Sequence, residues 1–506
     1  MPCKGVSHNY LENWTSQLTT TYPGHVEWVY VVEQDGDEAH QAIGKFLTHY
    51  QEKNQLSDEY MQRISVVVSG VSRHNAQKIH NMIHGVGQCP NAKYVCFFDD
   101  DIRVHPGCIE TMVTDIEEDP SVLVSTGYSV EFPRKDAPFA CFCITVYRSI
   151  NLLGFLTRRP QFAWGGCFMT HRQSVVSNYG DILNIWRDGG YSDDMAVGNM
   201  ALRSGRKIAS HPSTMFPNRL PNTHTFGRSY VNFVKRQFFV LDTYYSPYDH
   251  AHNVLTACCV LIAGLLIAPP VLFTLINVPL LAARFIVGGG IGTQLNLQYS
   301  LFAMFLIGAV FLALSHNHMI ETLVDMINRQ GPPNSLKMEP FLSPVKIVAA
   351  LVVHLFVMPY AMASVLLQDY IDWGAVRYHK KNGRIVRAEH MNLTDEERQR
   401  ETETEKEREG ETERDGTTEF AEGEVEDTDT SSVPGEPTAS SILPQIRKAK
   451  PGEGNVQIPL SIDPVDRPWF RSAVSGIITN AGQGMPIVNA ISTLDIQPSP
   501  MSGTVV

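Results

Sequence analysis

Three long apolar stretches constrain this chain more than any other feature of its sequence. Residues 254–287 are almost wholly apolar, and residues 301–314 and 347–367 repeat the pattern. A run of about 18 or more apolar residues is long enough to cross a bilayer as a helix, so we expect an integral membrane protein. Pro269-Pro270 interrupts the first stretch, which predicts either one long kinked span or a tight helical hairpin.

The sequence ahead of these stretches has a different pattern. Within residues 1–250, strand-like apolar runs alternate with helix-compatible segments; the strand-like runs are 26–33, 64–69, 94–98 and 122–126. Such alternation predicts an α/β domain with a largely parallel sheet. The chain opens Met-Pro-Cys-Lys-Gly, which resembles the second half of a β-strand, so we expect the first strand of that sheet to be truncated.

The remaining sequence divides into three further segments. Residues 251–370 are expected to form transmembrane and interfacial helices, followed by a basic juxtamembrane segment at 371–387. By the positive-inside rule, this basic end faces the cytosol. Residues 388–506 form a tail rich in Glu, Thr, Pro, Gly and Ser, which buries too little apolar surface to fold alone.

The negative charge of the chain is concentrated in that tail. Residues 395–429 contain 17 acidic and five basic side chains, an excess equal to the formal net charge of −12 for all 506 residues. The rest of the chain is close to neutral and has no basic stripe. A nucleic-acid binder is therefore disfavoured.

Two acidic motifs are the strongest candidates for chemistry. Asp99, Asp100 and Asp101 directly follow the strand-like run at 94–98, and adjacent carboxylates repel one another unless a cation compensates. Mg²⁺ or Mn²⁺, shared with a substrate diphosphate, is the natural cation, and a solvated acidic turn is the alternative. Asp193 and Asp194 precede a helix-like segment, where they either cap the helix or supply a carboxylate base.

Two further segments gain meaning beside these motifs. Lys78 offers a cation near the strand ends, although a lone lysine is usually a surface residue. Residues 162–167 form a Gly-rich turn with an aromatic side chain, which serves equally well as a structural turn or as a ligand loop.

Taken in order, these motifs resemble the inverting glycosyltransferases of families 2 and 21, and most of all the plant-type ceramide glucosyltransferases. The resemblance covers about residues 1–385 and rests on these segments: 2–5, 13–18, 31–37, 77–81, 98–107, 164–167, 187–195 and 226–237. It implies a GT-A fold, an α/β domain with a mixed, mostly parallel sheet, followed by transmembrane helices and a disordered tail.

The resemblance also implies a role for each matching residue. On the donor side, Glu33 and Asp37 match the acids that contact uridine, and Lys78 and Arg236 match residues near the nucleotide. Asp99 and Asp101 match the metal ligands, and Asp99 also matches a residue that contacts the donor. On the acceptor side, Asp194 matches the catalytic base, and Trp164, Gly165 and Gly166 match the acceptor-facing loop. Gln237 stands where the wider family has Trp after its Arg, which weakens the implied acceptor-side role of this position.

The activity implied by the resemblance is transfer of glucose from UDP-glucose to the primary hydroxyl of ceramide, with inversion and with Mg²⁺ or Mn²⁺. The protein would lie in the Golgi or endoplasmic reticulum membrane with its catalytic domain facing the cytosol. Two alternatives are a processive β-glycan synthase and a non-catalytic membrane scaffold. The synthase would need about six or more spans and an intact Gln-x-x-Arg-Trp motif.

Overall fold

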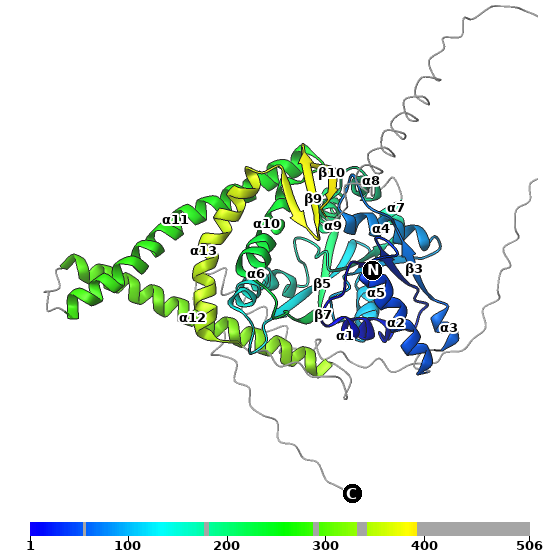
Figure 1. Cartoon of the computed structure of the whole chain (residues 1–506), viewed down its shortest axis with the longest axis horizontal. Helices are drawn as coiled ribbons and strands as arrows, with labels where there is room; N and C mark the ends of the chain where they lie inside the picture. The colour runs from blue at the N-terminus through cyan, green and yellow to red at the C-terminus, as the bar shows by residue number, and fades with distance from the viewer. Residues whose placement is uncertain (54–56, 177–181, 287–292, 331–341, 392–506) are drawn as a thin grey trace, which may run out of the picture. The chain divides into compact units, whose positions relative to one another are not determined.

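The computed structural model describes residues 1–53, 57–176, 182–286, 293–330 and 342–391. The predicted tail lies outside this part of the chain except for its first four residues, and there the prediction is wrong, because Ala388–His390 belong to a β-strand that spans Arg384–His390. An N-glycosylation sequon, Asn392-Leu393-Thr394, lies outside the described residues. Residues Met1–Leu393 form one compact unit, which includes both the α/β elements and the long apolar helices. The expected fold class is confirmed in its architecture: an α/β domain with a parallel sheet is followed by long apolar helices (Figure 1).

In the described part of the chain, the strands form three sheets. They are β1 Pro2–Cys3, β2 Trp28–Val32, β3 Ile64–Val68, β4 Tyr94–Phe98, β5 Val122–Phe132, β6 Cys167–His171, β7 Lys207–Arg219, β8 Tyr370–Trp373, β9 Val376–Lys381 and β10 Arg384–His390. The first sheet has the order β1-β2-β3 and is parallel, as predicted. The second has the order β4-β6-β5-β7 and is mixed, because β6 runs antiparallel to both of its neighbours. The third is an antiparallel meander of β8, β9 and β10.

The helices cover these sheets and extend beyond them. They are α1 Tyr10–Leu18, α2 Glu38–Glu52, α3 Asp58–Met61, α4 Gln77–Gln88, α5 Cys108–Glu118, α6 Phe139–Leu156, α7 Arg172–Val176, α8 Ile182–Arg187, α9 Asp193–Arg203, α10 Asn232–Phe239, α11 Pro247–Ile286, α12 Thr293–Gln330 and α13 Pro344–Leu366. A π-helix, Phe226–Val231, precedes α10, and a 3₁₀ turn, Val240–Asp242, follows it.

Local sequence explains where the helices around the site begin. The Asp37 carboxylate caps α2 by accepting a hydrogen bond of 2.8 Å from the Ala39 N–H. The Ser192 hydroxyl caps α9 in the same way, accepting from the Met195 N–H at 3.2 Å. Each cap satisfies one of the amide groups that a helix N-terminus otherwise leaves unpaired.

The core has a gap beside β1 and β2, the two strands nearest the N-terminus. β3 pairs along one side of β2, but on the other side only Pro2 and Cys3 pair with it among the described residues, opposite Val31 and Val32. Beyond them, a partly open cavity of about 660 Å³ lies between β2 and β4 and is lined by residues of both strands, including Val29 and Val95. The first strand is therefore short, and the sheet is interrupted beside it.

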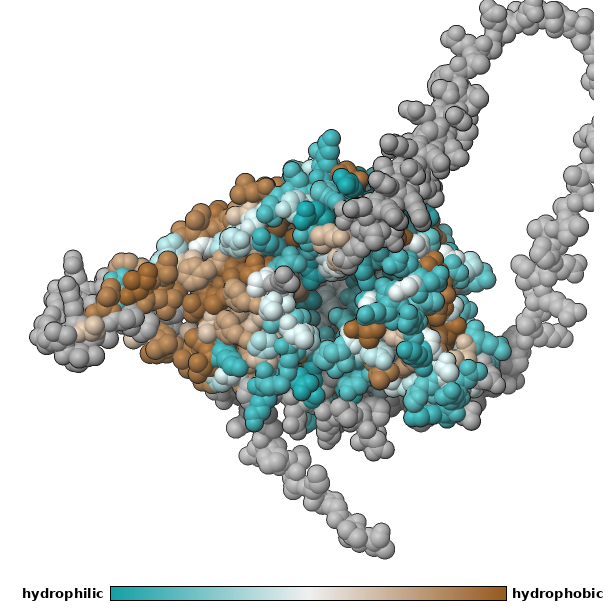
Figure 2. Space-filling view, viewed as in Figure 1, coloured by the Kyte–Doolittle hydropathy of each residue, from teal (hydrophilic) through white to brown (hydrophobic). Residues whose placement is uncertain are grey.

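Four described helices are long and apolar enough to cross a membrane: α6 and most of α11, α12 and α13. α11 runs unbroken through Pro269-Pro270, so residues 254–286 form one helix and not a hairpin. Hydrophobic residues gather over the long helices, whereas hydrophilic residues cover much of the α/β part (Figure 2). α6 differs from the other three because more than half of it is buried, and it packs on β5 and α13.

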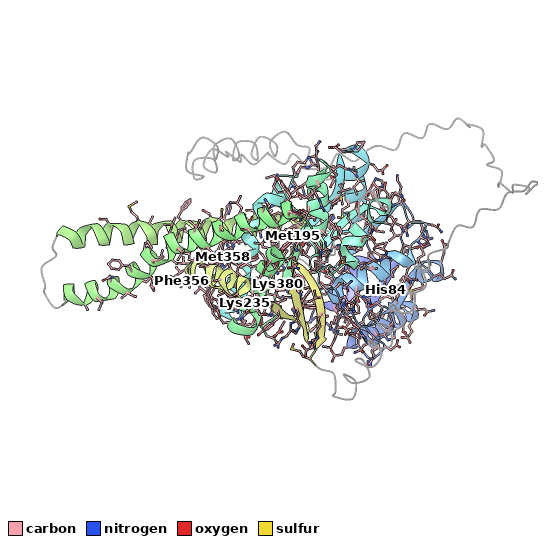
Figure 3. The ribbon with its side chains drawn as sticks, turned by 90° about the horizontal axis from the view of Figure 1, so that it is seen from above. His84, Met195, Lys235, Phe356, Met358 and Lys380 are labelled. Atoms are coloured by element: carbon pink, nitrogen blue, oxygen red, sulfur yellow. The ribbon has the colours of Figure 1, made fainter. Side chains whose placement is uncertain are left out.

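The segment expected to be basic and juxtamembrane folds into the third sheet. Asn382 and Gly383 both have positive φ, 52° and 78°, and they make the tight turn between β9 and β10. The Lys380 ammonium donates to the Val365 carbonyl at 3.2 Å, which joins this sheet to the end of α13. Figure 3, seen from above, places Lys380 where the long helices meet the α/β domain.

Candidate active site

The candidate site forms where strands of the first two sheets end. Glu33 directly follows β2, and Asp99, Asp100 and Asp101 directly follow β4. Ligands in α/β proteins bind at the carboxyl ends of parallel strands, so these acids lie where a donor is expected. The Asp99 N–H donates to the Gly166 carbonyl at 2.9 Å, which brings the predicted glycine turn to the same edge.

Lys78 joins three of the motifs that the sequence singles out. Its ammonium lies 2.7 Å from Asp99 Oδ1 and 3.1 Å from Asp193 Oδ2, and it donates to the Gly165 carbonyl at 3.0 Å. The Lys78 side chain is only 18% exposed. Lysine 78 is therefore not an ordinary surface residue.

Electrostatics explain why this buried cation is stable. Burial alone lowers the pKa of Lys78, but the carboxylates of Asp193 and Asp99 outweigh it and raise that pKa above its ordinary value. Burial also raises the pKa of Asp193, to about 6, although Lys78 opposes the shift. The three side chains thus form a tightly coupled cluster.

Asp194 occupies the other side of the same helix start. One carboxylate oxygen accepts from the Met195 N–H at 2.8 Å, and the other accepts from the Gly165 N–H at 3.2 Å. Asp194 therefore helps to cap α9 and also contacts the glycine turn. Its role as catalytic base stays a prediction.

The glycine turn fits tightly against these acids. A Cβ on Gly165 would lie 2.7 Å from Asp193 Oδ1, so any larger residue here would displace that carboxylate. The Trp164 side chain is 8% exposed and packs edge-on against Tyr128, with ring centroids 5.6 Å apart. A Cβ on Gly166 would collide with the Trp164 ring. Trp164 is therefore a core residue, and its ring fills the space beside Gly166 in the turn.

The residues expected to hold a metal suit one that is shared with a substrate. Among the described residues, no group of three His, Cys, Asp or Glu side chains could hold a metal ion. The Asp101 carboxylate is exposed and makes no hydrogen bond or ion pair with a described residue, whereas Asp99 is held by Lys78. Mg²⁺ in nucleotide sites commonly uses one or two carboxylates together with substrate phosphates, so Asp99 and Asp101 fit that role.

The predicted uridine-side acids make internal contacts. Glu33 is 4% exposed; Lys4 lies 2.5 Å from Glu33 Oε2 and His390 Nδ1 lies 3.3 Å from Oε1. Asp37 accepts from the Gly5 N–H at 2.9 Å in addition to capping α2. Both acids therefore anchor the start of the chain beside the site.

Arg236 and Gln237 both lie on α10, and the charge of Asp101 acts on Arg236. The Arg236 guanidinium lies over the Trp373 ring, 5.2 Å from its centroid. The Gln237 side chain makes no hydrogen bond with another described residue.

Sequence reasoning missed the residues that the third sheet brings to the site. Trp373 and Tyr378 lie in the segment 371–387, which was identified only as basic, and His390 lies in the part that was assigned to the tail. Alternating side chains on either side of Asn382-Gly383 were the signal, because that dipeptide is typical of a two-residue β-hairpin turn.

Comparison with known proteins bears on the first part of this site. The model of the family described as "Glycosyl transferase family 21" matches residues 1–137, which contain Glu33, Lys78 and Asp99. A comparison with curated proteins finds no match. Among solved structures, the chain is similar to "Mannosyltransferase PcManGT from Pyrobaculum calidifontis in complex with GDP-Man and Mn2+", with a TM-score of 0.34 and 14% identity over 70% of this chain and 85% of that chain.

Lys78 connects the segment that matches the family model to residues beyond that segment. Lys78 lies inside the matched segment, and it contacts Gly165 and Asp193, which lie beyond it. Residues 1–137 therefore resemble a glycosyltransferase family, and sugar transfer is the class of reaction that this match supports.

Proposed function

We propose that the protein transfers glucose from UDP-glucose to the primary hydroxyl of ceramide, giving β-glucosylceramide and UDP. The observation that carries this proposal is the cluster of Lys78, Asp99 and Asp193, with Asp194 beside it, in a chain that also has long apolar helices. The family match over residues 1–137 supports the transfer reaction. The apolar helices suit an acceptor that arrives from the bilayer.

The chemistry of the proposed step is a single displacement. Asp194 accepts the proton of the ceramide hydroxyl as its oxygen attacks the anomeric carbon, and the bond from that carbon to UDP breaks on the opposite face. One displacement inverts the α-linked donor to a β-glucoside. Lys78 places a fixed positive charge near Asp99, where negative charge develops on the departing diphosphate.

The donor site also requires a divalent cation in this proposal. Asp99 and Asp101 would hold Mg²⁺ or Mn²⁺, which when bound supplies positive charge opposite the diphosphate. We further propose that the protein lies in the Golgi or endoplasmic reticulum membrane. Its catalytic domain would face the cytosol, where UDP-sugars are present. A second N-glycosylation sequon, Asn13-Trp14-Thr15, lies in α1, and its Asn13 is buried, so it cannot report topology in the folded protein. The Asn392 sequon is therefore the better test. Glycosylation of Asn392 in cells would contradict this orientation.

The direct test is the mass of the lipid product. The full chain, reconstituted in vesicles with ceramide, UDP-glucose and Mn²⁺, should form a lipid that carries one hexose. A product with many hexoses, formed without ceramide, would indicate a processive synthase instead. A protein that neither binds UDP nor forms any product would be a scaffold.

Two matched variants separate the roles within the site. Asp194→Asn should lower transfer by about 10²–10⁴-fold and leave UDP binding intact, because the amide keeps the shape but cannot accept the proton. Asp101→Asn should instead weaken Mn²⁺-dependent UDP binding, since its proposed partner is the cation. Near-normal turnover of Asp194→Asn would limit Asp194 to a helix cap and make Asp193 the next candidate base.

A further inference from the structure

The third sheet packs directly on two segments of the candidate site. The Ile385 N–H donates to the Gly189 carbonyl at 2.9 Å, just ahead of Asp193. Gly189 has a φ of 72°, and a Cβ there would lie 2.7 Å from the Ile385 carbonyl oxygen. On the other side, the Gln77 N–H, next to Lys78, donates to the Tyr378 hydroxyl at 3.3 Å. The sheet therefore forms part of the wall behind the Lys78 cluster.

Trp373, the last residue of β8, contacts the arginine of α10. Its ring lies under the Arg236 guanidinium at 5.2 Å and packs edge-on against Tyr191, with ring centroids 6.1 Å apart. Tyr191 precedes Asp193 by two residues. Gln237, the residue after Arg236, brings no aromatic ring to this guanidinium. The aromatic contact of Arg236 therefore comes from a strand far along the chain.

The guanidinium of Arg236 has unused donor capacity near the acidic motif. Its Nε is buried and has no hydrogen-bond partner among the described residues. Burial lowers the pKa of Arg236, while the nearby Tyr191 and Asp101 act in the opposite direction. A buried donor without a partner costs free energy, so a ligand that accepts from it would be favoured.

Stacking and donation use different parts of a guanidinium. An aromatic ring attracts the cation through its flat face, and this leaves the N–H groups at the edge free. Those in-plane groups suit the paired oxygens of a phosphate. Trp373 can therefore hold Arg236 without competing with an anionic ligand.

We propose that Trp373 is a positioning residue, which holds the Arg236 guanidinium so that its free N–H groups bind the diphosphate of the donor. This inference rests on the proposed function, because the anion is the diphosphate of UDP-glucose. It makes the C-terminal sheet part of the donor site, and it connects that site to α13 through the few residues between Leu366 and Tyr370.

The test compares variants that remove the ring with a matched control. Trp373→Leu and Trp373→Met remove the ring, and the Met variant keeps more of the volume should the Leu variant fail to fold. Trp373→Phe keeps an aromatic face. Tyr370→Leu is the control, because the Tyr370 ring holds the Arg377 guanidinium at 4.4 Å on the same sheet, away from Arg236. Thermal unfolding of each full-length variant in detergent verifies folding.

Binding of UDP in the presence of Mn²⁺ is measured by calorimetry. Removing the ring should raise the Kd for UDP about tenfold, the loss expected for a desolvated cation–aromatic contact. Trp373→Phe should stay within about threefold of the wild type, and Tyr370→Leu should be unchanged. In transfer assays, KM for UDP-glucose should rise in the same order.

A double-mutant cycle distinguishes positioning from general packing. Trp373→Met combined with Arg236→Gln should bind UDP no more weakly than Arg236→Gln alone, because Trp373 acts through that side chain. Additive losses, or an unchanged Kd after removal of the ring, would overturn the inference while wild-type UDP binding upholds the proposed function. Absence of Mn²⁺-dependent UDP binding in the wild type would overturn both.

Discussion

Lys78 lies in the first turn of α4, where the helix dipole opposes a positive charge. The nearby carboxylates of Asp99 and Asp193 offset that cost, and the Gly165 carbonyl accepts one of the ammonium hydrogens. A lysine in this position is stable only because the tertiary structure surrounds it with acceptors. Its positive charge is thereby fixed beside Asp99 and Asp193, where the proposed function would use it to stabilise a diphosphate.

The absence of a side chain at Gly165 leaves room for the Asp193 carboxylate. Gly165→Ala should displace the Asp193 carboxylate, because the added Cβ would lie 2.7 Å from Oδ1. We expect at least about a tenfold loss of transfer, measured as kcat/KM for UDP-glucose. Gly44→Ala in α2 is the control, since its Cβ would meet nothing within 4 Å and alanine favours a helix. Equal activity of the two variants would contradict the tight fit at Gly165.

The titration of Asp193 predicts a pH-dependent contribution to stability. Its pKa is about 6 in the folded protein, against an ordinary value of 3.8, so between these pH values the folded chain keeps a proton that the unfolded chain has lost. Raising the pH through this window therefore favours unfolding. The stabilising contribution is full below about pH 4 and is lost as the pH rises past 6.

Comparison with Asp193→Asn isolates this effect, because the amide does not titrate. The unfolding free energy of the wild type should fall relative to the variant by about 3 kcal/mol between pH 4 and pH 7, at about 1.4 kcal/mol per pKa unit. Thermal unfolding in detergent across this range measures it. Asp35→Asn, at a side chain that is 83% exposed, should follow the wild type. Parallel curves for wild type and Asp193→Asn would contradict the raised pKa.

At the scale of elements, the gap between β2 and β4 is the weakest part of the α/β core. Met1 donates from its amino group to the Val29 carbonyl at 2.8 Å, and the cavity of about 660 Å³ continues past it. Unpaired strand edges leave backbone groups without partners, and the apolar lining stays incompletely packed. A strand parallel to β2 would satisfy both edges.

This gap leads to a prediction about an added strand. About five β-branched residues placed ahead of Met1 should pair with β2 and fill the cavity, since a strand rises about 3.3 Å per residue. We expect Tm to rise by about 5 °C or more, because each buried Val contributes about 1.5–3 kcal/mol, and turnover to rise with it. An extension of the same length made of Gly and Asp should have neither effect. Identical Tm values for the two extensions would contradict strand addition.

At the scale of the whole molecule, residues Met1–Leu393 behave as one unit because the C-terminal sheet closes back on the α/β domain. Its contacts reach Gly189 through Ile385 and Glu33 through His390. The long apolar helices are thus preceded and followed in sequence by elements of the same α/β unit. α13 is therefore followed, after three residues, by the sheet whose strands contact the site.

Two truncations test this division. Ending the chain after Leu393 should leave turnover within about twofold of the full chain, because it keeps every described contact. Ending it after Gln368 removes β8, β9 and β10 and should abolish transfer. Both are measured in vesicles at matched expression. A tenfold fall in turnover for the longer truncation would show that the tail takes part in the reaction.

The sequence by itself predicted the elements whose signals are local. Runs of apolar residues identified β2, β3, β4, β5 and the long helices, because burial and periodicity depend on neighbouring residues. The position of Asp99 at the end of β4 followed from the same pattern. The meeting of Asp99 with the segment around Asp193 was also predictable in part, since strand ends of one α/β domain converge at one edge.

Only the tertiary structure decided what surrounds those residues. The contacts of Trp373 with Arg236 and of His390 with Glu33 join segments on opposite sides of the apolar helices. The basic composition of residues 371–387 predicted a juxtamembrane segment. Basic residues on the exposed face of a sheet give the same composition as basic residues beside a membrane, so composition does not distinguish the two. Which of the two forms depends on long-range packing, and that packing is set by the whole fold and not by any local pattern.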